Sequence, residues 1–563
     1  MKPRRRLVTK QKKDRNPIIA RNSEIGATDA EYDDAFLFTC FVDNPAYSIA
    51  ADLGNNKTLL VGRTGSGKTA ILRMIESANS ERCSYISLPE MALSYVTNSD
   101  NMNFLLQLKI DLELFFIALW KHVICLEYVR SNYHILNNDQ SRNLIDKLTS
   151  AFNRDERKKK GIEYLRKWES KFWVTMDENI REITRQVEDK VSAEFGADVE
   201  KLRGNVGYVS AMSAVRRQQY EFRAKQIINS DLLVELSNVV EVLASFEEKG
   251  GNQRVRYILI DKIDEKWVDD KIKYHLIRAL IEAIKSLRKI RSLKVIVALR
   301  SDVLSKVIED SNNPGLQRDK YDDHIVNLYW EKRDLFELLN KRIDQLYKRK
   351  YTKNDVHFGD VFENRVSQKD PFEYMIERSL LRPRDVISFT NLALASAQGK
   401  TEVAAKDVKE AEAGYSRIRY EALVQEWAIA FPWLPNAFQI LRLGKTRFAI
   451  KDIPGNIVAE FALEVFSSDE LKGTSIHTAA KLALETQGSR ALSALAQEVL
   501  ATLYRIGAVG LKLNPNERYR YSHVDEPSVL PAELADETKV HVHPMLQRAL
   551  GIYDDQRSAR LDY

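Results

Sequence analysis

The chain contains few cysteines and no long apolar run. The longest apolar candidate, residues 112–129, is interrupted by Lys121 and His122, which is typical of a buried helix rather than a membrane span. Only three cysteines occur in 563 residues, and they are far apart: Cys40, Cys83 and Cys125. This spacing fits neither a disulfide framework nor a zinc site, so we expect a reducing compartment.

The surplus of positive charge is also small. Lys and Arg number 86 against 80 Asp and Glu, and a net charge of +6 does not by itself indicate a nucleic-acid-binding protein. The first fifteen residues nevertheless contain eight basic side chains and one acidic one. We interpret this segment as a disordered arm, either a solubilising tail or a salt-dependent contact with nucleic acid. No apolar stretch of the secretory type follows it, so we expect a cytoplasmic protein without membrane association.

A glycine-rich segment follows a short apolar run early in the chain. Residues 62–69, "GRTGSGKT", match the pattern G-x-x-x-x-G-K-[ST], with "KTLLV" before them reading as a strand and "TAILRMIESA" after them as a helix. Such a loop turns successive backbone N–H groups toward an anion, and the helix adds the positive end of its dipole. The residues predicted to bind a nucleotide are Gly62, Arg63, Thr64, Gly65, Ser66, Gly67, Lys68, Thr69 and Ala70.

Two further predicted strands end in polar residues. One runs from Tyr257 to Ile260 and ends at Asp261, and the other, "LKVIVALRSD", ends at Arg300. The ligand crevice of a parallel α/β sheet lies at the carboxyl ends of its strands. We therefore expect Lys68 to reach the β and γ phosphates, and Thr69 and Asp261 to hold Mg²⁺. Arg300 is placed to sense the γ phosphate.

These motifs, in this order, resemble a known superfamily. "FVDNPAYSIAADL", the phosphate loop, "LIDKIDE", "VIVALRSD", "GLQRDKYDD" and "HPMLQRALGI" are similar to AAA+ and STAND P-loop ATPases of the origin-recognition-like and KAP-type branches, and most similar to a poorly characterised bacterial family of large P-loop ATPases. The resemblance implies ATP with Mg²⁺ as the cofactors, and nucleotide-driven switching and assembly. Some relatives serve in defence against phage.

The chain departs from the family pattern after Asp261. Hydrolysing relatives usually have an acid next, which orients the attacking water, whereas this chain has Lys262. Glu265 is our first candidate for that catalytic acid and Asp264 the second, since a general base must come within about 3.2 Å of its water. If neither acid reaches the water, the protein binds ATP and hydrolyses it slowly, as suits a switch.

A helical lid is expected after the sheet. In "LLRPRDVISF" the resemblance implies that Arg384 or Arg382 reaches the nucleotide, while the alternative is a surface arginine beside Asp385. Arg318 in "GLQRDKYDD" is a candidate arginine finger acting on a neighbouring copy.

The carboxyl-terminal third is predicted to be a separate module. An amphipathic helix that ends at Gly507, a strand from Ala508, and a second strand from Arg518 after an Asn/Pro turn are typical of a winged helix. Such modules bind DNA or dock a protein. His541 and His543 lie in an alternating "VHVHP" strand, which we interpret as a sheet edge rather than a metal site.

The fold class that follows is α/β, a P-loop NTPase core with a parallel sheet, a large helical insertion, a helical lid and a winged-helix-like domain. The predicted divisions are a basic arm (1–30), the first part of the ATPase core (31–100), the helical insertion (101–250), the second part of the core (251–345), the lid (346–420) and the winged-helix-like domain (421–563). The basic "RKKK" cluster in the insertion is either a nucleic-acid contact or a solvated helix face.

Two functions from different classes remain open at the level of sequence. The first is an ATPase switch that assembles on double-stranded DNA or on an effector protein, with a homo-oligomer as one form of assembly, in phage defence or genome maintenance. The second is a nucleotide-binding scaffold with little hydrolysis, whose helical modules are interaction surfaces. Lys262 favours the second. The first is favoured by the full set of Lys68, Thr69, Asp261, Arg300 and Arg384.

Overall fold

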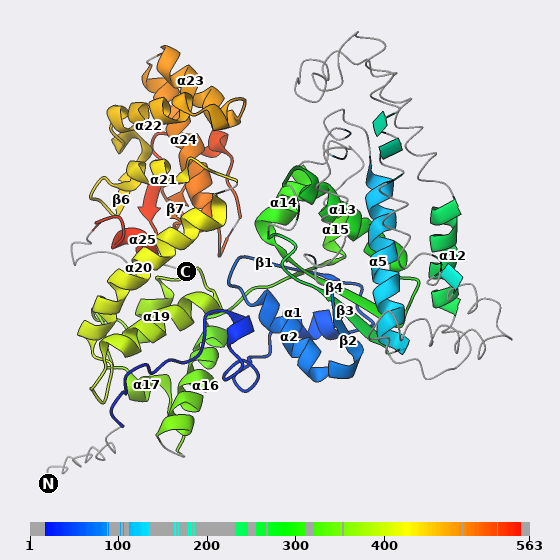
Figure 1. The fold of residues 1–563 in the computed structure, drawn as a ribbon. Coiled ribbons are helices and arrows are strands. Elements are labelled where there is room, and N and C mark those ends of the chain that lie inside the picture. Colours follow the sequence, from blue (N-terminus) through cyan, green and yellow to red (C-terminus); the bar gives the residue numbers. More distant parts are fainter. Residues whose placement is uncertain are drawn as a thin grey trace. The chain divides into compact units, whose positions relative to one another are not determined.

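The computed structural model describes residues 17–86, 112–133, 231–245, 255–309 and 319–552, apart from single positions within these ranges, together with isolated positions between 88 and 185. Two compact units divide the chain (Figure 1). The sheet unit comprises residues 43–63 and 68–328, and the helical unit comprises residues 1–42, 64–67 and 329–563. Each unit is described by itself below.

The sheet unit is built on five parallel strands. Their order across the sheet is β2-β3-β4-β1-β5. In register, Gly62 at the end of β1 lies opposite Arg300 at the end of β4, and Ile260 at the end of β3 lies opposite Val297. The strands are β1 (Leu59–Gly62), β2 (Cys83–Tyr85), β3 (Arg256–Ile260), β4 (Leu293–Arg300) and β5 (Ile325–Asn327).

Helices cover both faces of this sheet (Figure 1). Side chains of β1, β3 and β4 alternate between the two faces, and nearly all of them are buried, as expected of a parallel sheet covered on both sides. One face packs against α1 and α2 and the other against α5, α13 and α14. The helices are α1 (Pro45–Ala51), α2 (Lys68–Ala78), α5 (Glu113–Tyr133), α12 (Asp231–Ser245), α13 (Asp270–Leu287), α14 (Ser301–Glu309) and α15 (Asp319–Asp322).

The loop before β1 is fixed by a buried lysine. Lys294 is 4% exposed, and its ammonium donates hydrogen bonds to the carbonyl oxygens of Asp52, Asn55 and Lys57 at 2.9, 2.6 and 2.9 Å. Burial lowers the pKa of Lys294 to about 8. Three carbonyl acceptors compensate for the lost hydration of the ammonium, so this charge holds the entry to β1 in place.

The first part of the helical unit consists of five helices together with the amino-terminal segment, residues 17–42. In this group, Arg342 of α16 forms a buried ion pair with Asp33 at 2.5 Å and donates to the carbonyl oxygen of Ile25 at 2.9 Å, which ties residues 17–42 to the helices. The helices are α16 (Lys332–Lys350), α17 (Phe358–Val361), α18 (Pro371–Ile376), α19 (Pro383–Ser396) and α20 (Ala405–Trp427).

The remainder of the helical unit combines further helices with a small antiparallel sheet, in the order β6-β8-β7. Its helices are α21 (Leu434–Ala437), α22 (Gly455–Ser467), α23 (Ser475–Thr486), α24 (Ser489–Ile506) and α25 (Pro544–Gln547), and its strands are β6 (Arg447–Ala449), β7 (Val509–Lys512) and β8 (Lys539–Val542). As predicted, α24 ends at Gly507, which adopts a left-handed conformation with φ of 89° that glycine reaches without steric cost.

Two details of this module differ from the sequence prediction. The segment from Arg518 does not form a full second strand, since only Arg520 bridges to Leu511, and the partner of β7 is β8. β8, which contains His541, is the central strand rather than a sheet edge. His541 of the alternating "VHVH" pattern is buried rather than facing solvent. Its Nδ1 lies 2.5 Å from the hydroxyl of Tyr521.

No helix in the part of the chain that the structure describes combines the length and the apolar character needed to cross a lipid bilayer.

A buried charge network stabilises the first turn of α19. Asp385 has no exposed surface and accepts hydrogen bonds from Arg382 at 3.0 Å and from Arg419 of α20 at 2.9 Å. Burial alone would raise the pKa of Asp385, but the two guanidinium groups lower it to about 2. The carboxylate therefore stays ionised, and it is the only counter-charge within 3.5 Å of Arg419 among the described ion pairs.

We expect Asp385→Asn to lower the free energy of unfolding by about 3–5 kcal/mol, because among the described residues it leaves the buried Arg419 without its counter-charge and Arg382 with only Glu426, at 3.6 Å. Denaturant titration of the whole chain measures the change. Glu485→Gln, which breaks the exposed Lys481–Glu485 pair on α23, is the matched control and should change stability by less than about 0.5 kcal/mol. Equal effects of the two substitutions would contradict this account of the network.

Candidate functional site

Lys68 lies at the carboxyl end of the central strand β1. It is the first residue of α2, and its ammonium donates hydrogen bonds to the carbonyl oxygens of Gly62 and Arg63, both at 3.1 Å. The side chain thus turns back along the phosphate-loop segment, with its charge at the edge where β1 ends. This is the position that a phosphate-binding lysine requires.

The structure brings together the two residues predicted to hold a metal ion. Asp261 follows the last residue of β3, and the side chain of Thr69 in α2 forms a hydrogen bond with its carboxylate. Burial raises the pKa of Asp261, while the bond from Thr69, the backbone N–H of Lys262 at 2.9 Å and the charge of Lys68 act in the opposite direction. A hydroxyl and a carboxylate oxygen side by side are hard oxygen ligands of the kind Mg²⁺ prefers.

The backbone at Lys262 has an unusual conformation. It adopts a left-handed conformation with φ of 58°, which costs a residue with a Cβ about 1–2 kcal/mol. Its carbonyl oxygen accepts a hydrogen bond from the backbone N–H of Glu265 at 3.0 Å, so the chain turns sharply after β3. This turn aims the Lys262 N–H at the Asp261 carboxylate, and strain of this type is found at functional sites.

The turn places the two candidate catalytic acids differently. Asp264 is partly buried, and its Oδ2 lies 3.6 Å from Nε of Arg300, while it also adds negative charge near Asp261. Glu265 is exposed. The sequence analysis put Glu265 first and Asp264 second, whereas in the structure Asp264 is the acid that lies beside Arg300.

Arg300 is held by a second carboxylate that the sequence analysis missed. Asp302 in the first turn of α14 accepts two hydrogen bonds from its guanidinium, at 3.0 and 2.7 Å. Because β4 lies between β1 and β3, Arg300 ends up between Gly62 and Asp261 in the strand order. The signal available in sequence was the spacing of two residues in "RSD", where a fork of donors and a carboxylate meet at a strand-to-helix turn.

The tip of the phosphate loop, Thr64–Gly67, belongs to the helical unit. Gly65 and Gly67 have φ values of 75° and 99°. The hydroxyls of Thr64 and Ser66 are buried and have no hydrogen-bond partner among the described residues. Buried hydroxyls without partners are costly, and phosphate oxygens would satisfy both of them. The loop therefore fits a bound phosphate chain.

Three donors of the helical unit hold the carbonyl groups of this loop. Nη1 of Arg382 donates to Thr64 at 2.9 Å, the indole N–H of Trp330 donates to Ser66 at 2.7 Å, and the backbone N–H of Arg384 lies 3.4 Å from the carbonyl oxygen of Gly65. With its carbonyls engaged in this way, the loop can keep its N–H groups available for an anion. Trp330 was missed, since a single tryptophan between a strand and a helix forms no motif.

Arg382 and Arg384 have different roles in the structure. Arg382 is buried and paired with Asp385 and, at 3.6 Å, with Glu426. These pairs fix the guanidinium that donates to the carbonyl oxygen of Thr64 in the loop. Arg384 packs against Gly65 and donates from Nε to the carbonyl oxygen of Thr28 at 3.3 Å. Burial and the neighbouring Arg382 lower the pKa of Arg384. Arg384 is therefore not the surface partner of Asp385, and it remains the candidate nucleotide contact of the lid.

The other predicted site residues are either unremarkable or not covered. Arg63 and Ala70 flank the loop and are partly exposed. Arg318, the basic "RKKK" cluster, residues 1–16 of the predicted arm and most of the helical insertion lie outside the described residues. Residues 17–30, which the sequence analysis also assigned to the disordered arm, instead pack on the helical unit, with Ile19 and Ile25 buried.

Comparison with known proteins gives one match. Residues 333–424, which run from α16 to α20, match the family described as the FunZ-associated C-terminal helical domain. No curated protein and no solved structure matches the chain. The match supports a helical domain after the parallel sheet, in the part of the chain where the sequence predicted a helical lid.

We expect Gly65→Ala to weaken binding of Mg·ATP, the ligand expected from the sequence, at least about tenfold. The added methyl group would lie 2.8 Å from Cβ of Arg384, on a backbone with φ of 75°. Gly399→Ala is the matched control, because its φ of 82° imposes the same backbone strain while no atom lies within 4 Å of the added methyl group. A fluorescence titration with a labelled ATP analogue measures both. Unchanged affinity in Gly65→Ala would remove this loop from the binding site.

Proposed function

We propose that the protein binds Mg·ATP through residues 62–69 and Asp261 and acts as a nucleotide-dependent switch with slow hydrolysis. The observation that carries this proposal is the hydrogen bond between Thr69 and Asp261, two residues 192 positions apart that are predicted independently to be magnesium ligands. Lys68 at the end of β1 and the partnerless hydroxyls of Thr64 and Ser66 supply the phosphate-binding groups that such a site needs.

Each group has a definite task in this site. The ammonium of Lys68 exchanges the carbonyl oxygens of Gly62 and Arg63 for phosphate oxygens, and the hydroxyls of Thr64 and Ser66 donate to the same phosphate chain. Thr69 and Asp261 hold the metal ion, which when bound neutralises charge on the β and γ phosphates. Burial of Asp261 makes its carboxylate a strong ligand, since a poorly hydrated anion gains more from a cation.

Hydrolysis depends on the release of Asp264. To orient water, its carboxylate must be free to accept a proton, yet it faces Arg300, which is also bound by Asp302. A γ phosphate that draws Arg300 toward itself would free Asp264 for that role. Such a coupling gives slow turnover and a long-lived ATP state, which suits a switch.

The surface of the carboxyl-terminal module is better suited to a protein partner than to DNA. Arg518 and Arg520 of the predicted winged-helix-like domain pair with Asp525 at 2.5 Å and Glu517 at 3.0 Å, which offsets their charge. In α24, the helix that ends at Gly507, the side chain of Ser493 hydrogen-bonds Asp536. DNA binding draws most of its affinity from free cations that neutralise phosphates, so this surface is poorly suited to it.

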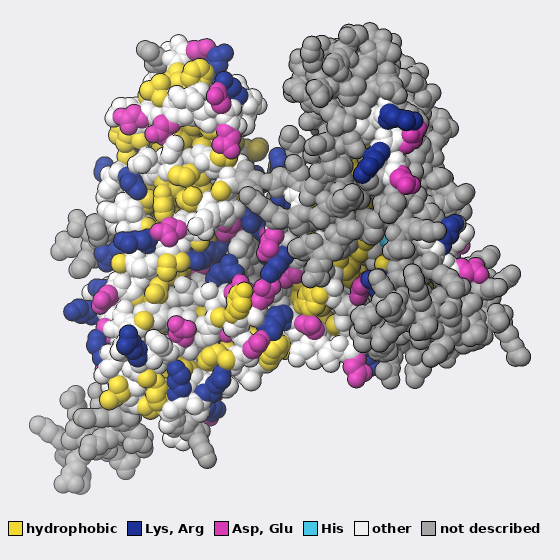
Figure 2. All heavy atoms as spheres, viewed as in Figure 1, with side chains coloured by type: hydrophobic (Ala, Val, Ile, Leu, Met, Phe, Trp, Pro, Cys, Tyr) yellow, Lys and Arg dark blue, Asp and Glu magenta, His cyan; other side chains and the backbone are white. Residues whose placement is uncertain are grey.

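Hydrophobic side chains instead reach the surface over α22 and α23 of this module. Figure 2 shows them among charged side chains, and they include Leu463, Phe466 and Leu482, which are 54%, 42% and 54% exposed. Exposed apolar side chains gathered on one face are typical of protein interaction sites. This observation favours the second candidate, a nucleotide-binding scaffold that docks an effector protein or another copy of the chain.

Two substitutions separate phosphate binding from metal binding. Lys68→Ala should weaken ATP at least about tenfold with and without Mg²⁺, because it removes a phosphate contact worth more than about 1.4 kcal/mol. Asp261→Asn should leave the affinity for metal-free ATP almost unchanged and abolish the increase in ATP affinity that Mg²⁺ causes. Calorimetric titrations in Mg²⁺ and in chelator measure both.

The control for these titrations is Lys406→Ala, an exposed charge at the start of α20, which should behave as the unmodified protein does. The proposal is wrong if Lys68→Ala binds ATP normally, or if Asp261→Asn keeps the full effect of Mg²⁺.

A further prediction concerns the catalytic acid. Phosphate release from Mg·ATP should fall about a hundredfold in Asp264→Asn, since loss of a general base costs about 10²–10⁴, and less than threefold in Glu265→Gln, whose acid is exposed. Affinity for ATP should persist in both. A fall confined to Glu265→Gln would restore the order favoured by sequence alone.

The same assay, run with and without double-stranded DNA, distinguishes the two functions. Stimulation by DNA supports a nucleic-acid-coupled switch. Binding of ATP with no phosphate release in any condition supports the scaffold.

A further inference from the structure

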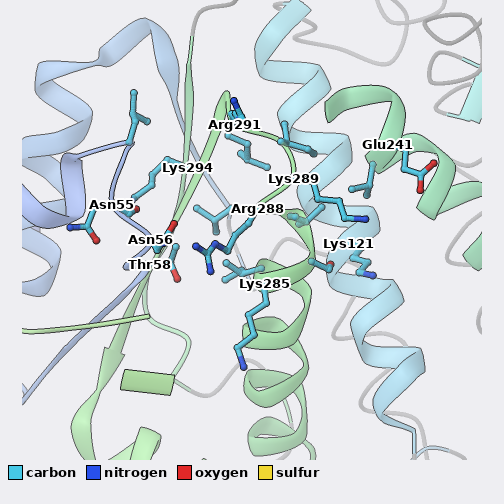
Figure 3. A pocket seen from close by; sticks show the side chains of 18 of the residues that line it. Asn55, Asn56, Thr58, Lys121, Glu241, Lys285, Arg288, Lys289, Arg291 and Lys294 are labelled. Atoms are coloured by element: carbon cyan, nitrogen blue, oxygen red, sulfur yellow. Dashed lines mark hydrogen bonds between the residues drawn. The ribbon is translucent and has the colours of Figure 1, made fainter. Parts of the chain in front are cut away.

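A cavity lies at the opposite end of the sheet from the phosphate loop. It measures about 940 Å³ and is lined by the loop before β1, by α5 and α12, and by the segment that joins α13 to β4 (Figure 3). Leu293, the first residue of β4, borders the cavity, whereas Arg300, the last, lies beside Asp264. Seven residues at about 3.3 Å each separate the two by roughly 23 Å, so the cavity is a separate site.

The lining of this cavity is strongly basic. Its cations are Lys121, Lys285, Arg288, Lys289, Arg291 and Lys294. Glu241 of α12 is the single acid among the lining residues. In Figure 3, Lys121 and Lys289 extend toward the same side, near Glu241, while Arg288 points toward Asn56 and Thr58 on the other side.

Two of these cations are already neutralised or bound. Lys294 donates to three carbonyl groups, and Lys285 pairs with Glu282 at 2.8 Å and lies 4.3 Å from the ring centre of Tyr321. The remaining four have no carboxylate within ion-pair distance among the residues that the structure describes: Lys121, Arg288, Lys289 and Arg291. Set against the one carboxylate of the lining, Glu241, these four cations leave a net charge of about three among the described residues at the cavity.

Ordinary helix electrostatics does not account for this cluster. Arg288 and Lys289 follow the last residue of α13, where the helix dipole amounts to roughly half a negative charge. That is far less than the summed charge of the lining. Lys121 is additionally half-buried, and burial together with the neighbouring Lys289 lowers its pKa. An anion bound near Lys121 and Lys289 would offset this unfavourable interaction between like charges.

The form of the cavity indicates what kind of anion fits. Its volume lies within the range of roughly 300–1,000 Å³ found for small-molecule sites. Part of its wall is apolar, with Leu53, Val240, Ile284, Leu287 and Val295 between the cations. A nucleic-acid backbone is instead tracked by cations spread along an open groove. Side chains of Asn55 and Asn56 add neutral hydrogen-bonding groups at one wall.

We infer that this basic pocket binds a small organic anion that carries two or more phosphate groups, of about the size of a nucleoside phosphate. The phosphates contact Lys121, Arg288 and Lys289, and the organic part packs on the apolar wall. Because the pocket borders the first residue of β4, its ligand acts on the strand that ends at Arg300. The inference does not depend on the phosphate loop being functional.

The test uses the full chain with Lys68→Ala, which removes the phosphate-loop contribution. Inorganic triphosphate is the probe, and calorimetry is the measurement. We expect one saturable site, and at least a tenfold loss of affinity when Arg288→Gln and Lys289→Gln are added. The matched control adds Arg442→Gln and Lys445→Gln, an exposed pair that removes the same charge elsewhere, and should leave the affinity unchanged.

Each outcome decides the inference. Equal loss in both double variants would mean that only net charge matters, and would overturn it, as would the absence of saturable triphosphate binding. A 20-base-pair duplex that binds through Arg288 and Lys289 while triphosphate does not would make the pocket a nucleic-acid contact instead. The four substituted side chains are exposed, so the substitutions leave the core unchanged. Melting curves of both double variants check that each one folds.

Discussion

Parallel pairing of β1 with β4, and of β4 with β3, is the constraint on which the rest of the sheet unit depends. Parallel strands end at the same edge, so this pairing alone carries Lys68, Arg300 and Asp261 to one place although they are far apart in the chain. The hydrogen bond between Thr69 and Asp261 is then a local consequence. Helices on both faces of the sheet bury its central strands, which holds this edge in place.

The elements of this sheet were predictable because their signals are local. An apolar run ending in Asp261 and a glycine loop followed by a helix specify β3, β1 and α2 to within about two residues. The end of α24 at Gly507 was equally clear, since a glycine in the left-handed conformation is a strong helix stop. Element type therefore followed from pattern wherever the periodicity was long or the breaker was strong.

What could not be predicted depends on long-range contacts or on backbone geometry. Nothing in the sequence shows that the turn at Lys262 brings Asp264 rather than Glu265 toward Arg300, because that depends on one left-handed residue. Trp330 and Arg382 hold the loop from positions more than 260 residues away. In the small antiparallel sheet, β7 pairs with β8 and not with the segment from Arg518, although that segment follows β7 more closely in the sequence.

The sheet order has a mechanical consequence for β4. This strand is hydrogen-bonded along one edge to β1 and along the other to β3, and six of its eight side chains are buried. A strand that is hydrogen-bonded along both edges cannot lengthen, so β4 can shift or tilt only as a whole. A displacement of Leu293 is therefore transmitted along β4 to Arg300, so the two ends of the sheet are coupled through this strand.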